Sequence, residues 1–161
     1  MLRDATSYFT IFGAGEQLVL KLGSKFIHFC RLKVNRARSL GTVAPSSRFL
    51  ARDMVTELKG GHGQNDDLVV ELGPGDGAIT RHILSSVQDQ SSVVPIEISS
   101  DSVAKLKRKF PVVNAVNDSA ANLEKYVPEH KKVRAIISGL PLRVMPQECV
   151  HQIGEAIHKV M

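Results

Sequence analysis

The sequence has no tryptophan, only 5% aromatic residues and only two cysteines among its 161 residues. Cys30 and Cys149 stand apart without metal-ligand spacing, which excludes a disulfide framework and favours a reducing compartment. No apolar run approaches the roughly 20 residues that a membrane-spanning helix needs, so we expect no such helix. Residues 1–4 are not followed by a compact apolar segment with a small-residue cleavage site, and we therefore expect no secretory signal.

Acidic residues are scarce in the first third of the chain. Up to residue 52 there are nine Lys or Arg against two Asp or Glu, a balance of +7. The remainder holds 12 basic and 14 acidic residues, a balance of −2, so the two parts sum to the overall +5. Such asymmetry favours a polyanionic partner, either an anionic membrane surface or a nucleic acid, over the alternative of a solubilising face.

The spacing of apolar residues over 14–34 predicts an amphipathic helix. Leu18, Leu22 and Phe29 share one arc of a helical wheel, and Lys21 and Lys25 fall on the opposite arc. A helix of this kind either lies in a membrane interface or docks on the protein's own core, and the pattern fits both.

A second helix is predicted to begin at Ser46 or Ser47, whose side chains suit an N-cap, and to run to about Lys59. A glycine-rich connector follows it. We therefore predict an N-terminal unit of basic amphipathic helices over residues 1–65, facing membrane or substrate, and a second unit over residues 66–161.

The second unit alternates between short apolar runs and helical patterns, which predicts crossover connections and a parallel sheet. The predicted strands are 68–72, 93–98, 112–116 and 133–137. The predicted helical segments are 78–87, 100–110, 123–127 and 146–160. The fold class is therefore α/β with a Rossmann-like parallel sheet of about four strands, preceded by helices.

The strongest motif lies between the first of these strands and its helix, and it reads Glu71-Leu72-Gly73-Pro74-Gly75-Asp76-Gly77. Glycines at alternate positions let the backbone turn sharply and approach a ligand, and the helix that follows offers free N–H groups. Glu97, at the end of the second strand, is placed to accept both hydroxyls of a ribose.

The spacing G-x-G-x-G differs from the dinucleotide fingerprint and resembles the glycine loop of class I S-adenosylmethionine-dependent methyltransferases. The resemblance implies S-adenosylmethionine as the cofactor and extends to the later segments. It assigns Asp118 and Ser119, after the third strand, to the adenine. It assigns Ser138 to Pro141, after the fourth strand, to the substrate and methyl-transfer region.

Four segments are similar to bacterial phospholipid N-methyltransferases, which methylate phosphatidylethanolamine or ornithine lipids: residues 41–51, 70–80, 96–99 and 138–142. This resemblance implies an amine-headgroup phospholipid as substrate and a cytoplasmic protein peripheral to the inner face of the cell membrane.

The cofactor residues expected from the two resemblances are Glu71, Gly73, Gly75, Asp76, Gly77, Glu97, Asp118 and Ser119. The expected substrate residues are Ser46, Ser47, Arg48, Ser138, Leu140 and Pro141. Ser46, Ser47 and Arg48 suit a lipid phosphate, because an Arg and a helix N-terminus attract anions. No catalytic base is identifiable, and the six histidines show no metal-ligand spacing.

The family has a seven-stranded sheet, whereas the predicted elements of this chain stop after the helix that follows the fourth strand. We therefore expect a chain truncated at its C-terminus, with strand four as an unpaired apolar edge that favours self-association and leaves little turnover.

Two alternatives stay open. An RNA adenine N6-dimethyltransferase has a similar glycine loop, but that family carries Pro followed by an aromatic after strand four, and here Leu142 follows Pro141. Nucleic acid is therefore the less favoured partner. The other alternative is a truncated module that binds a membrane or a nucleotide without turnover.

Overall fold

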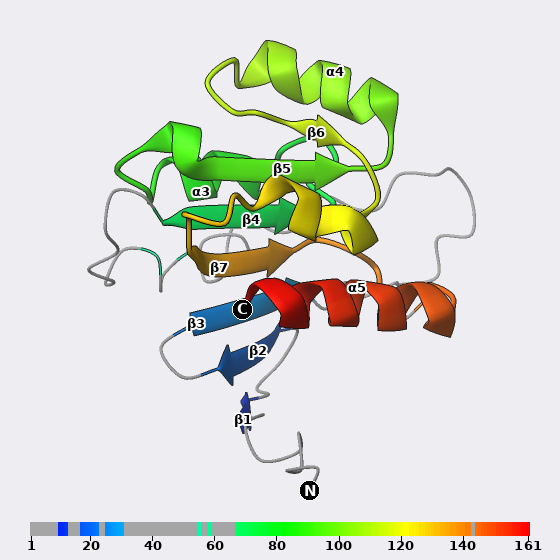
Figure 1. The fold of residues 1–161 in the computed structure, drawn as a ribbon. Helices are drawn as coiled ribbons and strands as arrows, with labels where there is room; N and C mark the ends of the chain where they lie inside the picture. Colours follow the sequence, from blue (N-terminus) through cyan, green and yellow to red (C-terminus); the bar gives the residue numbers. More distant parts are fainter. Residues whose placement is uncertain are drawn as a thin grey trace, which may run out of the picture.

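The computed structural model describes residues 67–142 and 144–161, together with Val55 and Leu58 and the backbone of three strands within residues 10–30. Its centre is one sheet with helical segments on both faces (Figure 1). Within the described residues, no helix is long and apolar enough to cross a membrane.

The four predicted strands of the second unit are present and run parallel to one another, which confirms the predicted Rossmann-like fold class. They are β4 (Leu68–Leu72), β5 (Val93–Glu97), β6 (Val116–Asn117) and β7 (Val133–Ser138). Their order is β7-β4-β5-β6, so β4 lies between β7 and β5. All five residues of β4 are buried, as expected for a central parallel strand.

The four predicted helical segments are present with somewhat different bounds, as α3 (Thr80–Leu84), α4 (Ser100–Lys109), η3 (Ala120–Tyr126) and α5 (Gln147–Val160). A short 3-10 turn that was not predicted, η2 (Gln90–Ser92), precedes β5. The third strand is the largest difference, because β6 has two residues where five were expected. Its pairing with β5 is limited to Ile96 and Glu97, while Pro111 lacks a backbone donor and Val112 is exposed.

The predicted helix over residues 14–34 is wrong. The chain instead forms β1 (Thr10–Phe12), β2 (Gln17–Leu22) and β3 (Lys25–Cys30). β2 and β3 pair antiparallel in a register that ends at Leu22 and Lys25, which leaves two residues between the strands. Those residues are Gly-Ser, a typical two-residue hairpin sequence, and β3 contains Phe26, Ile27 and Phe29, which are residue types common in strands.

The predicted unpaired edge at the fourth strand is also wrong. β7 pairs with β4 on one side and with β3 on the other, and both pairings are parallel. The N-terminal strands therefore extend the sheet to seven strands in the order β1-β2-β3-β7-β4-β5-β6. Self-association was expected because β7 would be an unpaired edge. β3 pairs with β7, so this edge is covered by the chain's own hairpin and gives no reason to expect self-association.

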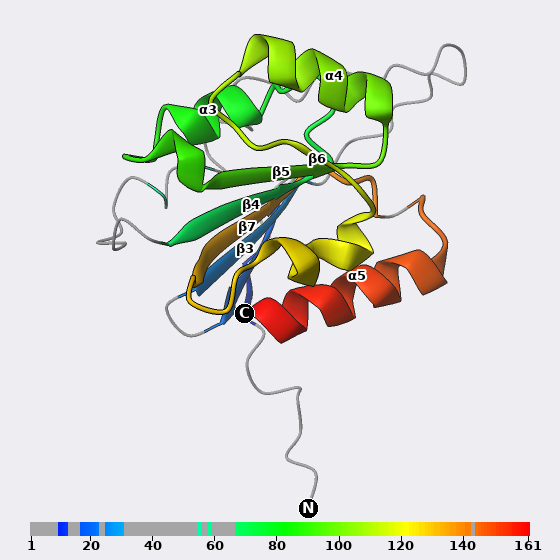
Figure 2. The same ribbon diagram turned by 45° about the horizontal axis from the view of Figure 1, so that its top comes forward.

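Helical segments lie on both faces of the sheet (Figure 2). Two apolar layers of side chains hold them to it. On one face, α3 and α4 pack over β4 and β5 through Ile83 and Leu106, and Val55 and Leu58 join this layer. On the other face, η3 and α5 pack together, with Leu123 among the fully buried side chains. The rest of the second predicted helix, including Ser46, Ser47 and Arg48, lies outside the described residues. The domain boundary near residue 65 stays a prediction.

Candidate functional site at the carboxyl ends of the parallel strands

The glycine loop follows β4 directly and turns the chain into α3. Gly73, Gly75 and Gly77 have φ values of 68°, 55° and 81°, in the left-handed region that side chains rarely adopt. A Cβ on Gly73 or Gly77 would collide with neighbouring side chains, whereas a Cβ on Gly75 would meet no atom within 4 Å. Gly75 is therefore the glycine of the loop with open space beside it, where a ligand can approach the backbone.

Glu97 ties the end of β5 to the glycine loop. Its Oε2 accepts a hydrogen bond from the Gly75 N–H at 3.0 Å, and its Oε1 accepts one from the Ser99 N–H at 3.0 Å. The backbone adds a further link, because the Gly73 N–H donates to the Ile96 carbonyl at 2.9 Å. A carboxylate has about four acceptor positions, so Glu97 is held in place by two donors and can still accept two more.

The segment after β7 packs against the same loop. The Gly139 N–H donates to the Leu72 carbonyl at 2.8 Å, and Leu140 lies so close to Gly73 that a Cβ there would be 2.6 Å from its Cδ2. Ser138 is fully buried, and its Oγ accepts a hydrogen bond from the Leu140 N–H at 3.3 Å. The structure thus brings together two of the predicted segments, the glycine loop and residues 138–141.

Glu71 is fully buried beneath the start of α3. Its Oε2 accepts a hydrogen bond from the Thr80 hydroxyl at 2.7 Å, while its Oε1 has no partner among the described residues. Burial is the main reason that the pKa of Glu71 is raised to about 8, although the Thr80 hydrogen bond opposes the shift and Glu97 adds to it. Glu71 is therefore largely protonated at neutral pH and braces the loop from within.

Asp118 lies beside Glu97, since its N–H donates to the Glu97 carbonyl at 3.2 Å. Its carboxylate accepts hydrogen bonds from Asn122 Nδ2 at 2.8 Å, from the Tyr126 hydroxyl at 2.7 Å and from the Ser119 N–H at 2.7 Å. These donors, with Asn122 contributing most, lower the pKa of Asp118 to about 2. Asp118 is thus a fixed negative charge at the carboxyl end of β6.

The last part of the loop is held by the end of α4. Lys109 Nζ donates to the Asp76 carbonyl at 2.7 Å, and the space beside Gly77 is filled by Phe110 and Leu106. The side chain of Asp76 is exposed and accepts from the Ala78 N–H at 3.1 Å, which fixes the turn before α3.

The predicted residues from Glu71 to Pro141 lie at or just after the carboxyl ends of β4, β5, β6 and β7, so they meet at one edge of the sheet. The sequence reasoning missed Asn122 and Tyr126, although their spacing of four and eight residues from Asp118 is a helical signal. It also missed Ile98, which is 76% exposed directly after Glu97 and is the most exposed large hydrophobic side chain among the described residues. Within residues 67–142 and 144–161, no group of three His, Cys, Asp or Glu is placed to hold a metal ion.

The chain is similar to methyltransferases in sequence and in fold. It is 27% identical over 128 residues to ornithine lipid N-methyltransferase of Singulisphaera acidiphila, a match that covers 76% of this chain and 65% of the relative. It is 35% identical over 79 residues to ribosomal RNA small subunit methyltransferase A of Methylococcus capsulatus, a match that covers 49% of this chain and 28% of the relative. The chain thus spans less than two thirds of the length of either relative. No protein-family model matches it.

Among solved structures, the chain resembles a protein of Clostridium thermocellum named as an rRNA methylase. The TM-score is 0.51 at 22% identity, and the match covers 60% of this chain and 54% of the other. The likeness supports the fold, which is the Rossmann-like fold of class I S-adenosylmethionine-dependent methyltransferases.

Proposed function

We propose that this protein binds S-adenosylmethionine at the carboxyl ends of β4 and β5 and transfers its methyl group to the amine of a phospholipid headgroup. The observation that carries the proposal is the hydrogen bond from the Gly75 N–H to Glu97 Oε2 at 3.0 Å. It joins an open glycine loop to an ionisable side chain with spare acceptor positions, at the edge of a parallel sheet where ligands of α/β proteins bind.

The described residues fit such a cofactor. Glu97 has acceptor positions left for the two ribose hydroxyls, and the exposed Ile98 offers an apolar surface for a flat ring. Asp118 supplies a fixed acceptor for an adenine amino group, and Ser119 is its neighbour at the start of η3. The open side of Gly75 leaves room for the amino-acid part against the loop. Glu71 stays inside, where it supports the loop through Thr80.

S-adenosylmethionine supplies an electrophilic methyl group on a sulfonium centre. The protein's part is to hold the acceptor in line with it and to keep water away. Leu140 is half-buried against Gly73 and is followed by the half-buried Pro141, so the two can form an apolar wall there. The buried Ser138 hydroxyl fixes that wall through the Leu140 N–H. A headgroup amine has a pKa on the order of 10 in water and must lose a proton before it attacks.

The choice of a lipid amine rests on two observations. The ornithine lipid N-methyltransferase match covers 76% of this chain, including residues outside the glycine loop. The segment Ser138-Gly139-Leu140-Pro141-Leu142 offers no aromatic ring on which a flipped base could stack. Ser46, Ser47 and Arg48 remain our proposed contacts for the lipid phosphate, with the protein at the inner face of the cell membrane.

A second candidate is methylation of an adenine in RNA. The higher identity of 35% to a ribosomal RNA methyltransferase favours it, although that match covers 49% of this chain. A third possibility is that the chain binds the cofactor without turning it over.

A methyl-transfer assay separates these functions. Labelled S-adenosylmethionine is offered with phosphatidylethanolamine vesicles or with unmodified ribosomal RNA, and we expect label in the lipid. Calorimetry measures cofactor binding in parallel. Glu97→Ala should weaken binding by about 1–3 kcal/mol, because a charged acceptor is lost. The matched control is Glu124→Ala, because the Glu124 carboxylate pairs with Lys159 at 3.0 Å. Label in RNA alone would select the second candidate, and binding without label in either would select the third.

A further inference from the structure

We propose that the outer side of α4 and the loop after it, residues 105–112, form a surface that docks on a membrane rich in anionic lipid. The proposal rests on the proposed function, because it names the surface that would bring the site to a lipid substrate. We call this surface the α4 patch.

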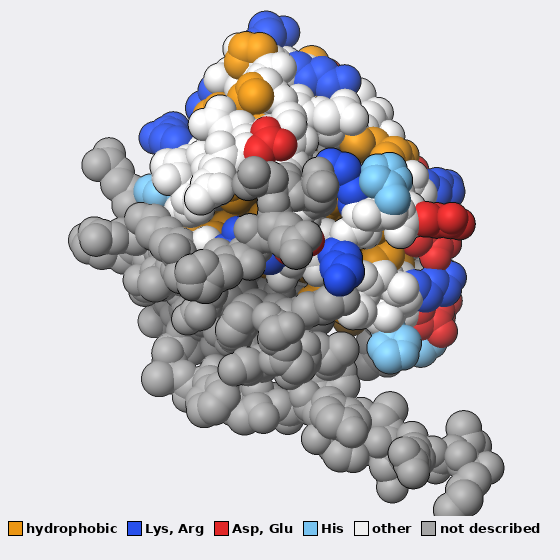
Figure 3. All heavy atoms as spheres, turned by 60° about the vertical axis from the view of Figure 1, so that its left-hand side comes forward, with side chains coloured by type: hydrophobic (Ala, Val, Ile, Leu, Met, Phe, Trp, Pro, Cys, Tyr) orange, Lys and Arg blue, Asp and Glu red, His pale blue; other side chains and the backbone are white. Residues whose placement is uncertain are grey.

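The α4 patch is strongly basic. Between residues 100 and 112 there are four basic residues and one acidic residue, a balance of +3. Lys105, Lys107 and Arg108 are exposed, and none of them makes an ion pair within the described part of the chain. Figure 3 shows Lys and Arg side chains gathered at the top of the molecule, where α4 lies, with hydrophobic side chains among them.

Helix stability alone does not account for this composition. Cations in the last turn of a helix complement its dipole, and Lys107, Arg108 and Lys109 lie in that turn. The dipole gives no reason for the exposed apolar residues that follow, Pro111 and Val112, of which Val112 is 48% exposed. Basic residues beside exposed apolar ones are the combination that binds an interface of anionic headgroups and acyl chains.

The α4 patch is joined to the candidate site. Lys109 donates to the Asp76 carbonyl of the glycine loop, and Phe110 fills the space beside Gly77. A membrane bound at this patch would therefore lie next to the loop that we propose holds the cofactor.

The same patch fits a nucleic acid less well. Proteins that bind single strands combine a basic groove with aromatic rings on which bases stack. The two aromatic residues of the fully described part of the chain are otherwise engaged: Phe110 packs against the core with Lys109 over its ring, and Tyr126 donates to Asp118.

The test uses the full chain and measures co-sedimentation with vesicles. We expect binding to mixed phosphatidylcholine and phosphatidylglycerol vesicles, and little binding to phosphatidylcholine alone. The double variant Lys105→Gln with Arg108→Gln should lower the partition coefficient about 30-fold at low salt, since each basic residue near such a surface contributes about fivefold. Val112→Ser should lower it further.

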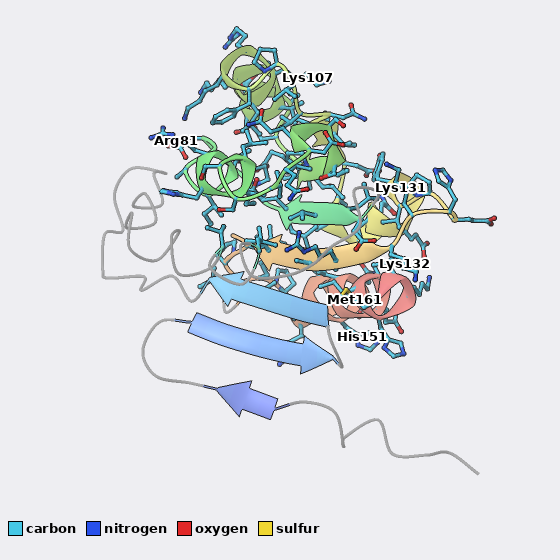
Figure 4. The ribbon with its side chains drawn as sticks, turned by 90° about the vertical axis from the view of Figure 1, so that its left-hand side faces the viewer. Arg81, Lys107, Lys131, Lys132, His151 and Met161 are labelled. Atoms are coloured by element: carbon cyan, nitrogen blue, oxygen red, sulfur yellow. The ribbon has the colours of Figure 1, made fainter. Side chains whose placement is uncertain are left out.

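The matched control is Lys131→Gln with Lys132→Gln, which removes the same charge. Figure 4 places Lys131 and Lys132 away from Lys107, near the start of β7. Equal losses in the two double variants, or no loss in the α4 variant, would overturn the proposal. The proposal would also be overturned if the protein bound RNA and not vesicles, and if the α4 variant abolished that RNA binding.

Cofactor calorimetry on the same samples keeps the two proposals apart. Loss of vesicle binding with unchanged cofactor affinity supports a separate docking surface. The protein could instead bind vesicles through α4 and show no binding of S-adenosylmethionine. That outcome would support the docking surface and contradict the proposed function.

Discussion

Gly139 and Gly73 bring two loops of the candidate site into backbone contact, because a Cβ on Gly139 would lie 2.8 Å from the Gly73 carbonyl oxygen. Real Cβ atoms essentially never approach backbone oxygen so closely, so one of the loops would have to move. The two glycines follow β7 and β4, which are neighbours in the sheet. The contact therefore fixes the segment after β7 relative to the glycine loop.

We predict that Gly139→Ala destabilises the protein by about 1–3 kcal/mol, the usual cost of overpacking, and weakens cofactor binding. Gly154→Ala in α5 is the control, because a Cβ there meets nothing within 4 Å and alanine favours a helix by about 1 kcal/mol. Urea unfolding and calorimetry measure the two effects. Equal stability of the Gly139 variant and the wild type would contradict the close contact.

Glu71 should make the protein less stable as the pH rises. Below about pH 4.5, the ordinary pKa, both folded and unfolded states hold the proton. Between pH 4.5 and the raised pKa of about 8, only the folded state keeps the proton on Glu71. The free energy of unfolding therefore falls progressively as the pH increases through this range. At about 1.4 kcal/mol per pH unit, the loss between pH 5 and pH 7.5 is about 3 kcal/mol.

Glu71→Gln should remove this pH dependence, because the amide is neutral throughout and can still accept from Thr80. Urea unfolding at the two pH values measures it, with Glu124→Gln at an exposed site as the control. A Glu71→Gln protein with the same pH dependence as the wild type would show that Glu71 is not the group responsible.

Asn122→Ala should raise the pKa of Asp118 from about 2 toward its ordinary value of 3.8, because Asn122 is the largest cause of the lowered pKa. Ionised Asp118 stabilises the folded state above pH 3.8, its ordinary pKa, and this stabilisation is lost as the pH falls toward 2. The Asn122→Ala variant should lose this stabilisation at a higher pH than the wild type does. NMR titration of the carboxyl carbon measures the shift. The pKa of Asp89, lowered by Ser91, should stay unchanged in the same spectra. An unaltered Asp118 would rule out the hydrogen bond from Asn122 as a cause.

Ile27→Pro should uncover the edge of β7. Ile27 is paired with Ile136 on one side and Leu20 on the other, and proline cannot donate to such a ladder. We expect lower stability and larger particles in light scattering, since an unpaired apolar edge promotes association. Ile11→Pro, in the terminal strand β1, should have a smaller effect. Equal effects of the two changes would argue against β3 as the strand that covers β7.

The alternating pattern of residues 66–161 was sufficient to predict four parallel strands and the helical segments between them, because each apolar run is short and bounded by turn residues. The glycine loop was also predictable, since its three glycines stand between a strand and a helix. The N-terminal strands were not predictable, because Leu18, Leu22 and Phe29 fit a helical wheel as well as they fit paired strands. Periodicity alone cannot choose between them over so short an apolar run.

The residue pattern alone predicted the four parallel strands, the position of the glycine loop and the placement of Glu97 and Asp118 at strand ends. These features depend on the spacing of apolar, glycine and acidic residues that are close together in the sequence. Three further features appear only in the folded chain: β3 pairs with β7, Gly139 lies against Gly73, and Lys109 donates a hydrogen bond to the glycine loop. Each of these contacts joins residues more than 30 positions apart. They depend on which strand edge is left to pair and which backbone segments can approach, and both are settled only when the sheet has formed.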